Sequence, residues 1–488
     1  MKIQRSGILL KPDCSRVLLR PFDVPGDERV CRTLGRIMSL AECDVQRLVE
    51  EMLSAFEGRH RKLRDFLLGR YAHVSRHLRE AGGIVTENRK LLIGSYFTQE
   101  YALECAALFN PSIVWHPDQS GLEAGARRFV LSLRATGEGH ISSIGFRTGT
   151  ITSRNEIRVD EPGRFVAAGE VVPDATYDRH LFTRKLREIG IASGVVDEVF
   201  SGLGELFTLP DLEARLGSVT RQSQAAMGGA RAFNRARVHI LTLAQSNYEV
   251  RFTADQPLSE RILFPTAPTE RNGIEDARFV RFTDDDGSGS ARYYATYTAY
   301  NGMTTVPQLI ETDDFLRFKV NTLNGPEIHN KGMALFPRKV GGVYAMLSRQ
   351  DNENIFLMRS EHPHFWSAKD LVLAPKEPWE FVQVGNCGSP IETDRGWLVL
   401  SHGVGAMRRY SISAFLLDLE DPRKVVGRLR EPLLFAEGDE REGYVPNVVY
   451  SCGALLNGDS LILPYAVSDY ATSFAVASLP EILDCMAN

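Results

Sequence analysis

The first part of the chain has the apolar spacing of amphipathic helices. Apolar residues recur every three or four positions over residues 40–56 and again over 63–78, which predicts two helices separated by a glycine. Ser39-Leu-Ala-Glu42 has the form of a capping box at the start of the first one. A third helix is expected from Thr98 to Leu108. We therefore predict a mostly helical N-terminal extension over residues 1–108.

From Pro111 onward the pattern changes to short runs of β-branched and aromatic residues separated by turn residues. Examples are residues 128–134, 291–298, 343–348 and 396–401. This pattern predicts hairpins in an all-β sandwich, barrel or propeller.

The strand and turn unit recurs near residues 128, 278, 333, 396 and 448. The intervals are about 50 to 70 residues once a helical stretch at about 183–232, interpreted as an insertion, is set aside, and propeller blades have about that period. Residues 109–488 are therefore expected to form one β domain.

Composition and charge describe an ordinary folded protein. The 488 residues include Asp+Glu 62 against Lys+Arg 57, for a net charge of −5, and 43% are hydrophobic. The acidic balance disfavours a dedicated nucleic-acid binder. No window approaches the roughly 18 apolar residues of a membrane span, and charges interrupt the apolar pieces of the first residues, so we expect neither a membrane partner nor a secretion signal.

Cysteine usage and short motifs limit the chemistry. The seven cysteines are scattered, odd in number and without a C-x-x-C pair, which argues against a disulfide framework and a zinc site and favours a reducing cytoplasm. Complete dinucleotide, P-loop, H-E-x-x-H, EF-hand and nucleophile-elbow motifs are absent. We expect no metal or nucleotide cofactor.

Polar and charged residues gather in blocks at the ends of apolar runs. These blocks are Asn110-Pro-Ser112, His116-Pro-Asp-Gln119, Ser132 to His140, Gly273-Ile-Glu-Asp-Ala-Arg278, His329-Asn-Lys331, Arg349-Gln-Asp351, Gly385 to Pro390, Ser401 to Val404, Arg408-Arg-Tyr410 and Gly443 to Asn447. On a radial β fold such strand ends converge on one mouth, where loops carry function.

Three of these segments resemble motifs of the inverting mannoside phosphorylases of glycoside hydrolase family 130. Gly273-Ile-Glu-Asp-Ala-Arg278 resembles the G-x-E-D-P-R segment, Lys331-Gly-Met-Ala-Leu-Phe-Pro337 resembles K-x-x-x-L-F-P, and Gly396 to Val404 resembles G-W-L followed by H-G-V. They stand in the family's order, and the resemblance extends from about Asn110 to the C-terminus. It implies a five-bladed β-propeller, here with the helical extension and the helical insertion.

The resemblance places the general acid on Asp276. Inorganic phosphate is the nucleophile in the family, so one protonated carboxyl group suffices, and the proton is thought to pass through the mannose 3-hydroxyl. Strand alternation puts Asp276 and Arg278 on one face and points Glu275 away. Because a nearby cation lowers a carboxyl pKa, this acid must recover its proton affinity from burial or from bound phosphate.

The resemblance also implies a phosphate site. Arg349, His402 and Tyr410 match its Arg, His and Tyr, and Lys331 is expected to join them. The family's lysine is replaced here by Gln383, so an arginine after His402 is expected to supply the missing charge. Both Arg408 and Arg409 are candidates, and we favour Arg408 because alternation gives it the same face as Tyr410.

Sugar contacts are expected from polar residues beside an aromatic platform. The candidates are Asn110, Arg134, His140, Arg278, Asp351 and Tyr444. Two alternatives stay open, because Asn110 is also suited to cap the turn before Pro111 and His140 to be a hydrogen-bonded structural histidine.

We therefore predict a cytoplasmic enzyme that cleaves a β-mannoside with phosphate and releases α-D-mannose 1-phosphate. The long N-terminal unit and the Ser132 to His140 block resemble the branch acting on β-1,2-linked oligomannan. The alternatives are a β-mannosidase on the same fold, a β-1,4-mannosyl-glucose phosphorylase and a non-catalytic carbohydrate-binding propeller. The partners expected are a β-mannooligosaccharide and phosphate, and the apolar stripes of the first 108 residues allow a homo-oligomer.

Overall fold

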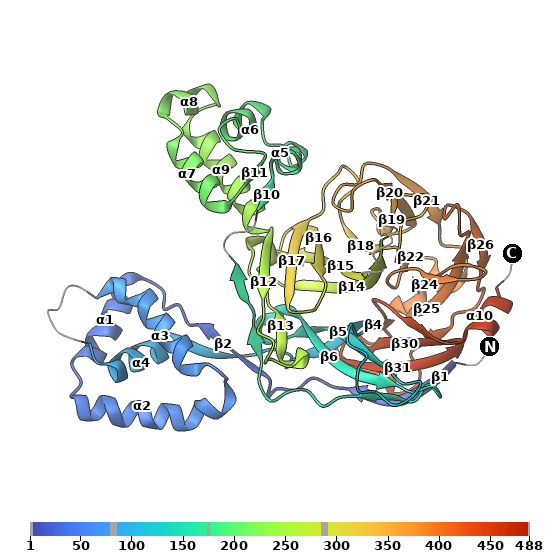
Figure 1. The fold of residues 1–488 in the computed structure, drawn as a ribbon, viewed down its shortest axis with the longest axis horizontal. Helices are drawn as coiled ribbons and strands as arrows, with labels where there is room; N and C mark the ends of the chain where they lie inside the picture. The colour runs from blue at the N-terminus through green and yellow to red at the C-terminus, as the bar shows by residue number, and fades with distance from the viewer. Residues whose placement is uncertain (1–2, 79–84, 173–175, 285–290, 487–488) are drawn as a thin grey trace.

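The computed structural model describes residues 3–78, 85–172, 176–284 and 291–486, which form mostly β structure with two groups of helices (Figure 1). Five sheets of four or more strands lie within these residues, and we number them in chain order.

The first three sheets each contain four to six strands, named in their order of pairing. Sheet 1 contains β4 (Ala107–Trp115), β5 (Arg127–Thr136), β6 (Ser142–Ile151), β13 (Arg261–Leu263) and β8 (Ala167–Ala168), with β7 (Ile157–Val159) beside β6. Sheet 2 contains β14 (Ile274–Thr283), β15 (Ala291–Tyr300), β16 (Thr305–Thr312), β17 (Arg317–Thr322), β12 (Tyr248–Arg251) and β9 (Glu170–Val172). Sheet 3 contains β18 (Lys331–Leu335), β19 (Tyr344–Arg349), β20 (Ile355–Ser360) and β21 (Lys369–Leu373).

The last two sheets follow the same meander. Sheet 4 contains β22 (Gln383–Asn386), β24 (Gly396–Val404), β25 (Tyr410–Leu417) and β26 (Val425–Arg428), with β23 (Ile391–Thr393) beside β24 and β27 (Leu434–Phe435) beside β25. Sheet 5 contains β28 (Val449–Tyr450), β30 (Ser460–Val467), β31 (Ala471–Ser478) and β1 (Ile3–Leu10), with β29 (Leu455–Asn457) beside β30. A short helix, α10 (Leu479–Asp484), follows β31.

Each sheet packs on its neighbours through buried apolar side chains. Pairs that lie in the cores between successive sheets are Phe146 and Phe279 (sheets 1 and 2), Tyr294 and Met346 (sheets 2 and 3), Leu347 and Phe415 (sheets 3 and 4), Leu398 and Leu461 (sheets 4 and 5) and Ile462 and Leu131 (sheets 5 and 1). Burial of these apolar faces is the main stabilising contribution to the β part. Because the fifth core joins sheet 5 to sheet 1, every sheet has two neighbours.

A buried or half-buried glutamate stands just before the first strand of every sheet and binds a side chain of that same sheet. The pairs are Glu104 with Arg147, Glu270 with Tyr297, Glu327 with Lys369, Glu380 with Arg428 and Glu440 with Tyr465. In three of them the carboxylate also accepts a backbone N–H of its own 3-10 turn. A glutamate contact of the same kind therefore fixes the chain just before the first strand of all five sheets.

Two helical groups project from the sheets (Figure 1). The first contains α1 (Asp27–Met38), α2 (Glu42–Phe56), α3 (Leu63–Val74) and α4 (Glu87–Tyr96). The second contains α5 (Arg179–Glu188), α6 (Ser193–Phe200), α7 (Leu209–Ser218), α8 (Arg221–Ala226) and α9 (Ala230–Gln245), with the short strands β10 (Tyr177–Asp178) and β11 (Leu206–Phe207). Each group has its own apolar core. Among the described residues, no helix is long and apolar enough to cross a lipid bilayer.

The structure corrects the N-terminal prediction in three places, two at strands and one at the predicted capping box. The helix predicted over Thr98–Leu108 is wrong, because β3 (Thr98–Ala102) pairs with β2 (Val17–Pro21) and β4 follows. Residues 3–10 are a strand of sheet 5 that pairs with β31 near the other end of the chain. Local spacing cannot reveal such long-range pairing.

The predicted capping box is also wrong. The Ser39 hydroxyl donates to the Arg36 carbonyl at 2.8 Å at the end of α1, whereas Glu42 accepts from Thr86 and Arg89. The inserted helices run from residue 179 to 245, further than the stretch of about 183–232 that the spacing indicated.

Candidate active site

The candidate side chains gather at one end of the sheets, where first strands begin and second strands finish. Because neighbouring strands are antiparallel, Lys331 at the start of β18 lies opposite Arg349 at the end of β19. Hydrogen bonds then join different sheets at this end. They connect Asn110 to Asp276, Arg278 to Tyr450 and Arg349 to His402.

Asp276 lies at the centre of this group and is buried. Its Oδ1 accepts a hydrogen bond of 2.6 Å from Nδ2 of Asn110, and Nη1 of Arg134 lies 3.6 Å from the same oxygen. Its backbone is left-handed, with φ 56°, at a bulge in the pairing of β14 with β15. Bulges of this kind aim one side chain away from the regular alternation.

The bulge overturns the prediction that Glu275 points away from Asp276. Oε1 of Glu275 accepts from Nη2 of Arg134 at 2.8 Å, so the same guanidinium contacts both carboxylates. Arg278 does not bind the Asp276 carboxylate, because its Nη1 donates to the main-chain carbonyl of that residue at 3.1 Å. Its Nη2 donates to the hydroxyl of Tyr450 at 2.6 Å.

The environment of Asp276 favours its ionised form. Burial by itself would raise the pKa of this carboxyl, but the positive charges of Arg134, Arg278 and Lys331, together with the Asn110 hydrogen bond, outweigh burial and lower the pKa below its usual value. The carboxyl of the free protein is therefore ionised at neutral pH, whereas a general acid must hold a proton.

A cationic cluster lies beside the carboxyl. We define the anion cluster as Lys331, Arg349, His402, Arg408 and Tyr410. Nη1 of Arg349 lies 3.2 Å from Nε2 of His402, whose ring stacks on Tyr410 with centroids 5.8 Å apart and an interplanar angle of 11°. Burial and then the charges of Arg349 and Arg278 lower the pKa of His402 well below its usual value. The imidazole is therefore neutral and accepts from Arg349 through Nε2.

Gln383 supports Arg349 at the edge of the anion cluster. A guanidinium only donates hydrogen bonds, so the amide of Gln383 must turn its oxygen toward it. In that orientation the oxygen accepts from Nη1 of Arg349 at 2.7 Å and the nitrogen donates to the Asn352 carbonyl at 3.2 Å. Gly385 is required nearby, because a Cβ there would lie 2.4 Å from Cε1 of His402.

The two adjacent arginines of sheet 4 face different ways. Cζ of Arg408 lies 6.0 Å from the Tyr410 ring, and its backbone is left-handed with φ 55°. Cζ of Arg409 lies 4.2 Å from the ring of Phe435, on the other side. Arg408 is therefore the arginine that lies beside Tyr410.

Comparisons with known proteins identify the family of this chain. The model of glycoside hydrolase family 130, described as beta-1,4-mannooligosaccharide phosphorylase, matches residues 230–488, and a 1,2-beta-oligomannan phosphorylase of Thermoanaerobacter sp. is 34% identical over 236 residues, which are 46% of this chain and 75% of that protein. The chain belongs to glycoside hydrolase family 130.

Two further relatives are similar to this family member. A beta-1,2-mannobiose phosphorylase of Listeria innocua is 32% identical over 253 residues, which are 50% of this chain and 67% of that protein. The solved structure of a beta-1,2-mannobiose phosphorylase from Listeria innocua, in complex with beta-1,2-mannobiose, is 21% identical, covers 79% of this chain and 93% of its own, and has a TM-score of 0.46.

The candidate sugar contacts of this family 130 member fall into three groups. Asn110, Arg134 and Arg278 surround Asp276. His140 and Tyr444 contact each other, with ring centroids 5.7 Å apart. Asp351 does not join them, because its exposed carboxylate accepts from the backbone N–H groups of Glu353 and Asn354 at 2.9 and 2.8 Å and closes its own turn.

Asn110 does more than cap a turn. Its backbone is left-handed, with φ 49°, at a bulge between Phe109 and Ser112, and the side chain donates to Asp276. Its Oδ1 is buried and has no hydrogen-bond partner among the described residues. The turn-cap alternative therefore does not account for the contacts of this side chain.

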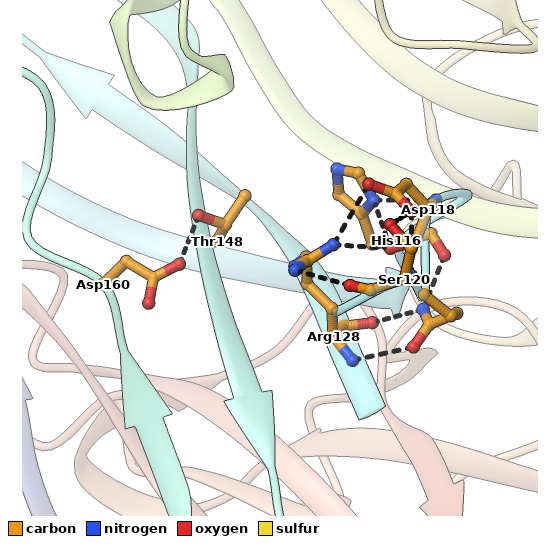
Figure 2. A network of polar contacts seen from close by, with 7 residues as sticks. His116, Asp118, Ser120, Arg128, Thr148 and Asp160 are labelled. Atoms are coloured by element: carbon orange, nitrogen blue, oxygen red, sulfur yellow. Dashed lines mark hydrogen bonds and ion pairs between the residues drawn. The ribbon is translucent and has the colours of Figure 1, made fainter. Parts of the chain in front are cut away.

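The polar block at His116 has a structural role (Figure 2). Nδ1 of His116 accepts the backbone N–H of Asp118 at 2.9 Å, and the Arg128 guanidinium donates to the carbonyls of Asp118 and Ser120. These bonds close the turn between β4 and β5, at the end of the hairpin opposite Arg134. Turn residues such as these satisfy their own backbone and need no ligand.

Sequence reasoning missed two side chains of the site, Asp469 and Tyr450. Tyr450 binds Arg278 and meets the His402 ring edge-on at 4.9 Å. Asp469 is half-buried in the turn between β30 and β31 with φ 49°. Burial and the negative charge of Asp276 raise its pKa to about 6 despite nearby cations.

Asp469 occupies a turn position that recurs in two other sheets, an equivalence that only the structure reveals. The turns between the second and third strands of sheets 1, 4 and 5 hold His140, Arg408 and Asp469, each with a left-handed backbone. No set of three or more His, Cys, Asp or Glu side chains suited to a metal ion occurs in the part of the chain that the structure describes.

Proposed function

We propose that this chain is a glycoside phosphorylase that cleaves β-1,2-linked mannosides with inorganic phosphate. The products are α-D-mannose 1-phosphate and an acceptor shortened by one mannosyl unit. Its family and the names of its relatives, 1,2-beta-oligomannan phosphorylase and beta-1,2-mannobiose phosphorylase, support this reaction and linkage.

The observation that carries the proposal is the surplus of hydrogen-bond donors next to Asp276. The Nε atoms of Arg278 and Arg349 are buried and have no hydrogen-bond partner in the described residues, although the two side chains are only 3% and 7% exposed. Buried donors are almost always satisfied, so unpartnered ones facing a cationic cluster indicate an anionic ligand. Phosphate, with several acceptor oxygens, fits this arrangement.

Each member of the site has a defined task in this reaction. Arg349, Lys331 and Arg408 neutralise the phosphate dianion, and His402 and Tyr410 provide further polar contacts. Asn110, Arg134 and Arg278 hold the mannosyl ring and orient Asp276. Phosphate attacks C1 from one face while Asp276 supplies the proton that the departing oxygen takes up, so that the configuration is inverted.

Bound phosphate also explains how Asp276, which is ionised in the free protein, can hold the proton that a general acid needs. In the free protein the surrounding cations keep this carboxyl ionised. A bound dianion counteracts the charges of Lys331 and Arg278, which raises the proton affinity of the carboxyl. The Asp276 carboxyl is therefore protonated only when phosphate is bound. Water alone is a poor substitute for phosphate as the nucleophile.

A β-mannosidase is the second candidate, because Asp469 and Glu275 add carboxyl groups near Asp276. An inverting hydrolase needs such a group as a base for water, with the two carboxyls roughly 6.5–9.5 Å apart. The cation surplus has no task in that reaction, and we therefore rank hydrolysis second.

We further propose that the five sheets are the blades of a five-bladed β-propeller. The five inter-sheet cores and the glutamate repeated before each first strand support this architecture. The helical N-terminal group and the inserted helices are then additions to the propeller. Seven cysteines without a disulfide fit a reducing compartment, and we propose that the enzyme is cytoplasmic. We also propose that it uses no cofactor.

One assay tests this function. The protein is incubated with β-1,2-mannobiose, β-1,4-mannobiose and β-1,4-mannosyl-glucose, each with and without phosphate, and mannose 1-phosphate and free mannose are quantified. We expect phosphate-dependent release of mannose 1-phosphate from the β-1,2-linked substrate. Release of free mannose at the same rate without phosphate would instead establish the hydrolase.

A further inference from the structure

Two exposed rings from distant parts of the chain meet at the rim of the candidate active site. The rings of His140 and Tyr444 have centroids 5.7 Å apart and planes inclined by 34°, and the Tyr444 hydroxyl lies 3.3 Å from Nδ1 of His140. Tyr444 is 58% exposed, and His140 is exposed as well. Two aromatic side chains that face solvent together are not held there by burial in a core.

The loop that carries His140 is built to present the ring. Its backbone is left-handed, with φ 59°, a conformation that residues other than glycine rarely adopt. The buried Tyr101 donates its hydroxyl to the carbonyls of Glu138 and Ile141, at 2.9 and 3.1 Å. Gly137 is required for this approach, because a Cβ there would lie 2.7 Å from the Tyr101 hydroxyl.

Close contacts also fix the backbone of the segment that carries Tyr444. The backbone N–H of Val445 donates to the Ser468 carbonyl at 2.9 Å, beside Asp469. Gly443 packs so closely on this turn that a Cβ would lie 2.6 Å from Cβ of Ser468. Both rings therefore stand on loops with fixed backbones, as residues of a binding site do.

The position of the pair relative to the anion cluster identifies its side of the site. His140 follows β5 in sheet 1, and Tyr444 precedes β28 in sheet 5, whereas Arg349 and His402 belong to sheets 3 and 4. In the sequence of inter-sheet cores, sheets 1 and 5 are neighbours, sheet 5 also adjoins sheet 4, and sheet 1, which carries His140, adjoins neither sheet 3 nor sheet 4. Sheet 2, which carries Asp276, lies between sheet 1 and sheet 3.

Inversion at a sugar carbon places the nucleophile and the leaving group on opposite faces of that carbon. With phosphate held by sheets 3 and 4 and the cleaved mannosyl ring at the buried Asp276, we expect the departing sugar to extend toward sheet 1 and the exposed His140 and Tyr444 rings. We propose that His140 and Tyr444 form a platform for the departing, acceptor-side mannosyl ring of the oligomannoside. This inference rests on the proposed function and assigns the side on which the acceptor binds.

The chemistry of the pair suits a sugar ring. A pyranose has an apolar face of C–H groups that packs on an aromatic ring and hydroxyls at its edge that need donors and acceptors. Tyr444 supplies both a flat apolar surface and a hydroxyl, and His140 supplies a ring with a second polar nitrogen. Charged groups are not required, which agrees with the neutral acceptor.

The test compares Tyr444→Ala, His140→Ala and Tyr444→Phe with the wild type in phosphorolysis of β-1,2-mannotriose and in synthesis from mannose 1-phosphate. We expect the two alanine variants to raise KM for mannotriose and for the acceptor by tenfold or more, with KM for phosphate unchanged within twofold. Tyr444→Phe keeps the stacking surface and is expected to change the acceptor KM by only a few fold. Tyr96→Ala, at a tyrosine 49% exposed on α4, is the matched control and is expected to change neither constant.

Acceptor KM values within twofold of wild type in both alanine variants would overturn the platform. Failure of the proposed function is a different result, in which the wild type cleaves no substrate in a phosphate-dependent way. Calorimetric titration of β-1,2-mannotriose into the wild type and Tyr444→Ala then decides the platform by binding alone. At least tenfold weaker binding to the variant supports it, and equal binding or no binding to the wild type refutes it.

Discussion

Two arginines of the candidate site, Arg134 and Arg349, are held in opposite ways. In the acid half, formed by sheets 1 and 2, Arg134 contacts the carboxylates of both Glu275 and Asp276. In the anion half, formed by sheets 3 and 4, Arg349 contacts the neutral partners His402 and Gln383. Among the described residues, no carboxylate lies within 4.0 Å of the charged groups of Lys331, Arg349 or Arg408.

This difference separates a structural charge pair from a binding charge. A cation that is already paired with carboxylates gains little from a ligand, whereas a buried cation with only neutral partners remains costly until an anion arrives. The anion half is therefore prepared for phosphate, and the acid half is prepared to hold the sugar and the proton donor. The predictions below test this division from the largest expected effect to the smallest.

The largest effect is expected in the acid half. Asp276→Asn keeps the shape and the partners of the side chain but removes the proton donor, so kcat should fall by about 10²–10⁴-fold. Isothermal titration should show mannoside binding within a few fold of wild type. Retention of more than about a tenth of the activity would remove Asp276 from its role.

The next effect belongs to the anion half. Arg349→Ala should raise KM for phosphate by tenfold or more with little change in KM for the mannoside, since the loss of one charge-assisted hydrogen bond costs about 1.5–3 kcal/mol. His402→Ala should act in the same direction. Initial-rate kinetics with both substrates varied separate the two constants. An equal rise in both would show that the two halves are not independent.

The adjacent arginines provide an internal control for the division. Arg408→Ala should raise KM for phosphate several fold, because its guanidinium lies on the Tyr410 side, whereas Arg409→Ala should leave it unchanged, because Arg409 lies over Phe435. Equal effects of the two substitutions, or none from either, would mean that Arg408 does not replace the charge absent at Gln383.

A smaller effect links the two halves through a proton. An anion bound by Lys331 and Arg349 should raise the pKa of Asp276, which the free protein keeps low, so binding should take up part of a proton at pH 7. Sulfate is a suitable probe because it does not itself titrate near neutrality. Calorimetry in buffers of different ionisation enthalpy measures the uptake.

The control variants assign that proton. Loss of the uptake in Asp276→Asn is expected, with the uptake retained in Asn110→Ala. His402 also has a lowered pKa, so His402→Ala is measured in parallel. Uptake that persists in Asp276→Asn and vanishes in His402→Ala would assign the proton to the histidine instead.

The smallest effect concerns stability and has opposite signs for two carboxyls of one site. The pKa of Asp469 is raised in the folded state to about 6 from 3.8, so its stabilising contribution is complete below pH 3.8 and is lost as the pH rises through about 6. Asp469→Asn should therefore stabilise the protein at pH 8 relative to pH 4, by about 3 kcal/mol at most.

Asp276→Asn should behave in the opposite way. Its folded-state pKa is lowered, so the contribution of the carboxylate is present at neutral pH and is lost as the pH falls toward and below 4. Thermal unfolding of both variants and the wild type from about pH 2 to about pH 8 measures the two slopes. Parallel pH profiles for the two variants would contradict the assigned environments.

Several features of the site were visible in the sequence because they depend only on residue type and order. The motif around Asp276, the cations Lys331 and Arg349 and the imidazole of His402 could be selected in this way, and the structure brings all four to one end of the sheets. Strand alternation favoured Arg408 over Arg409 beside Tyr410, and Arg408 does lie there, although it stands in the turn before β25 with a left-handed backbone.

Other features depend on contacts between segments far apart in the chain. Asp469 and Tyr450 enter the site from sheet 5, and no local pattern marks them as partners of Asp276 and Arg278. Asp351 shows the converse, because a side chain selected as a sugar contact accepts the backbone N–H groups of its own turn.

What the sequence by itself determined is therefore the identity of the main chemical groups, since a carboxyl, a guanidinium or an imidazole is a property of single residues and their motifs. Only the tertiary structure decided which way these side chains point and whether they are protonated. The bulge at Asp276 turns Glu275 toward the same arginine, strand β3 pairs with β2 instead of continuing a helix, and burial among several charges sets the pKa values of Asp276 and Asp469. Backbone bulges, long-range pairing and burial all arise from neighbours distant in sequence, and local spacing does not contain them.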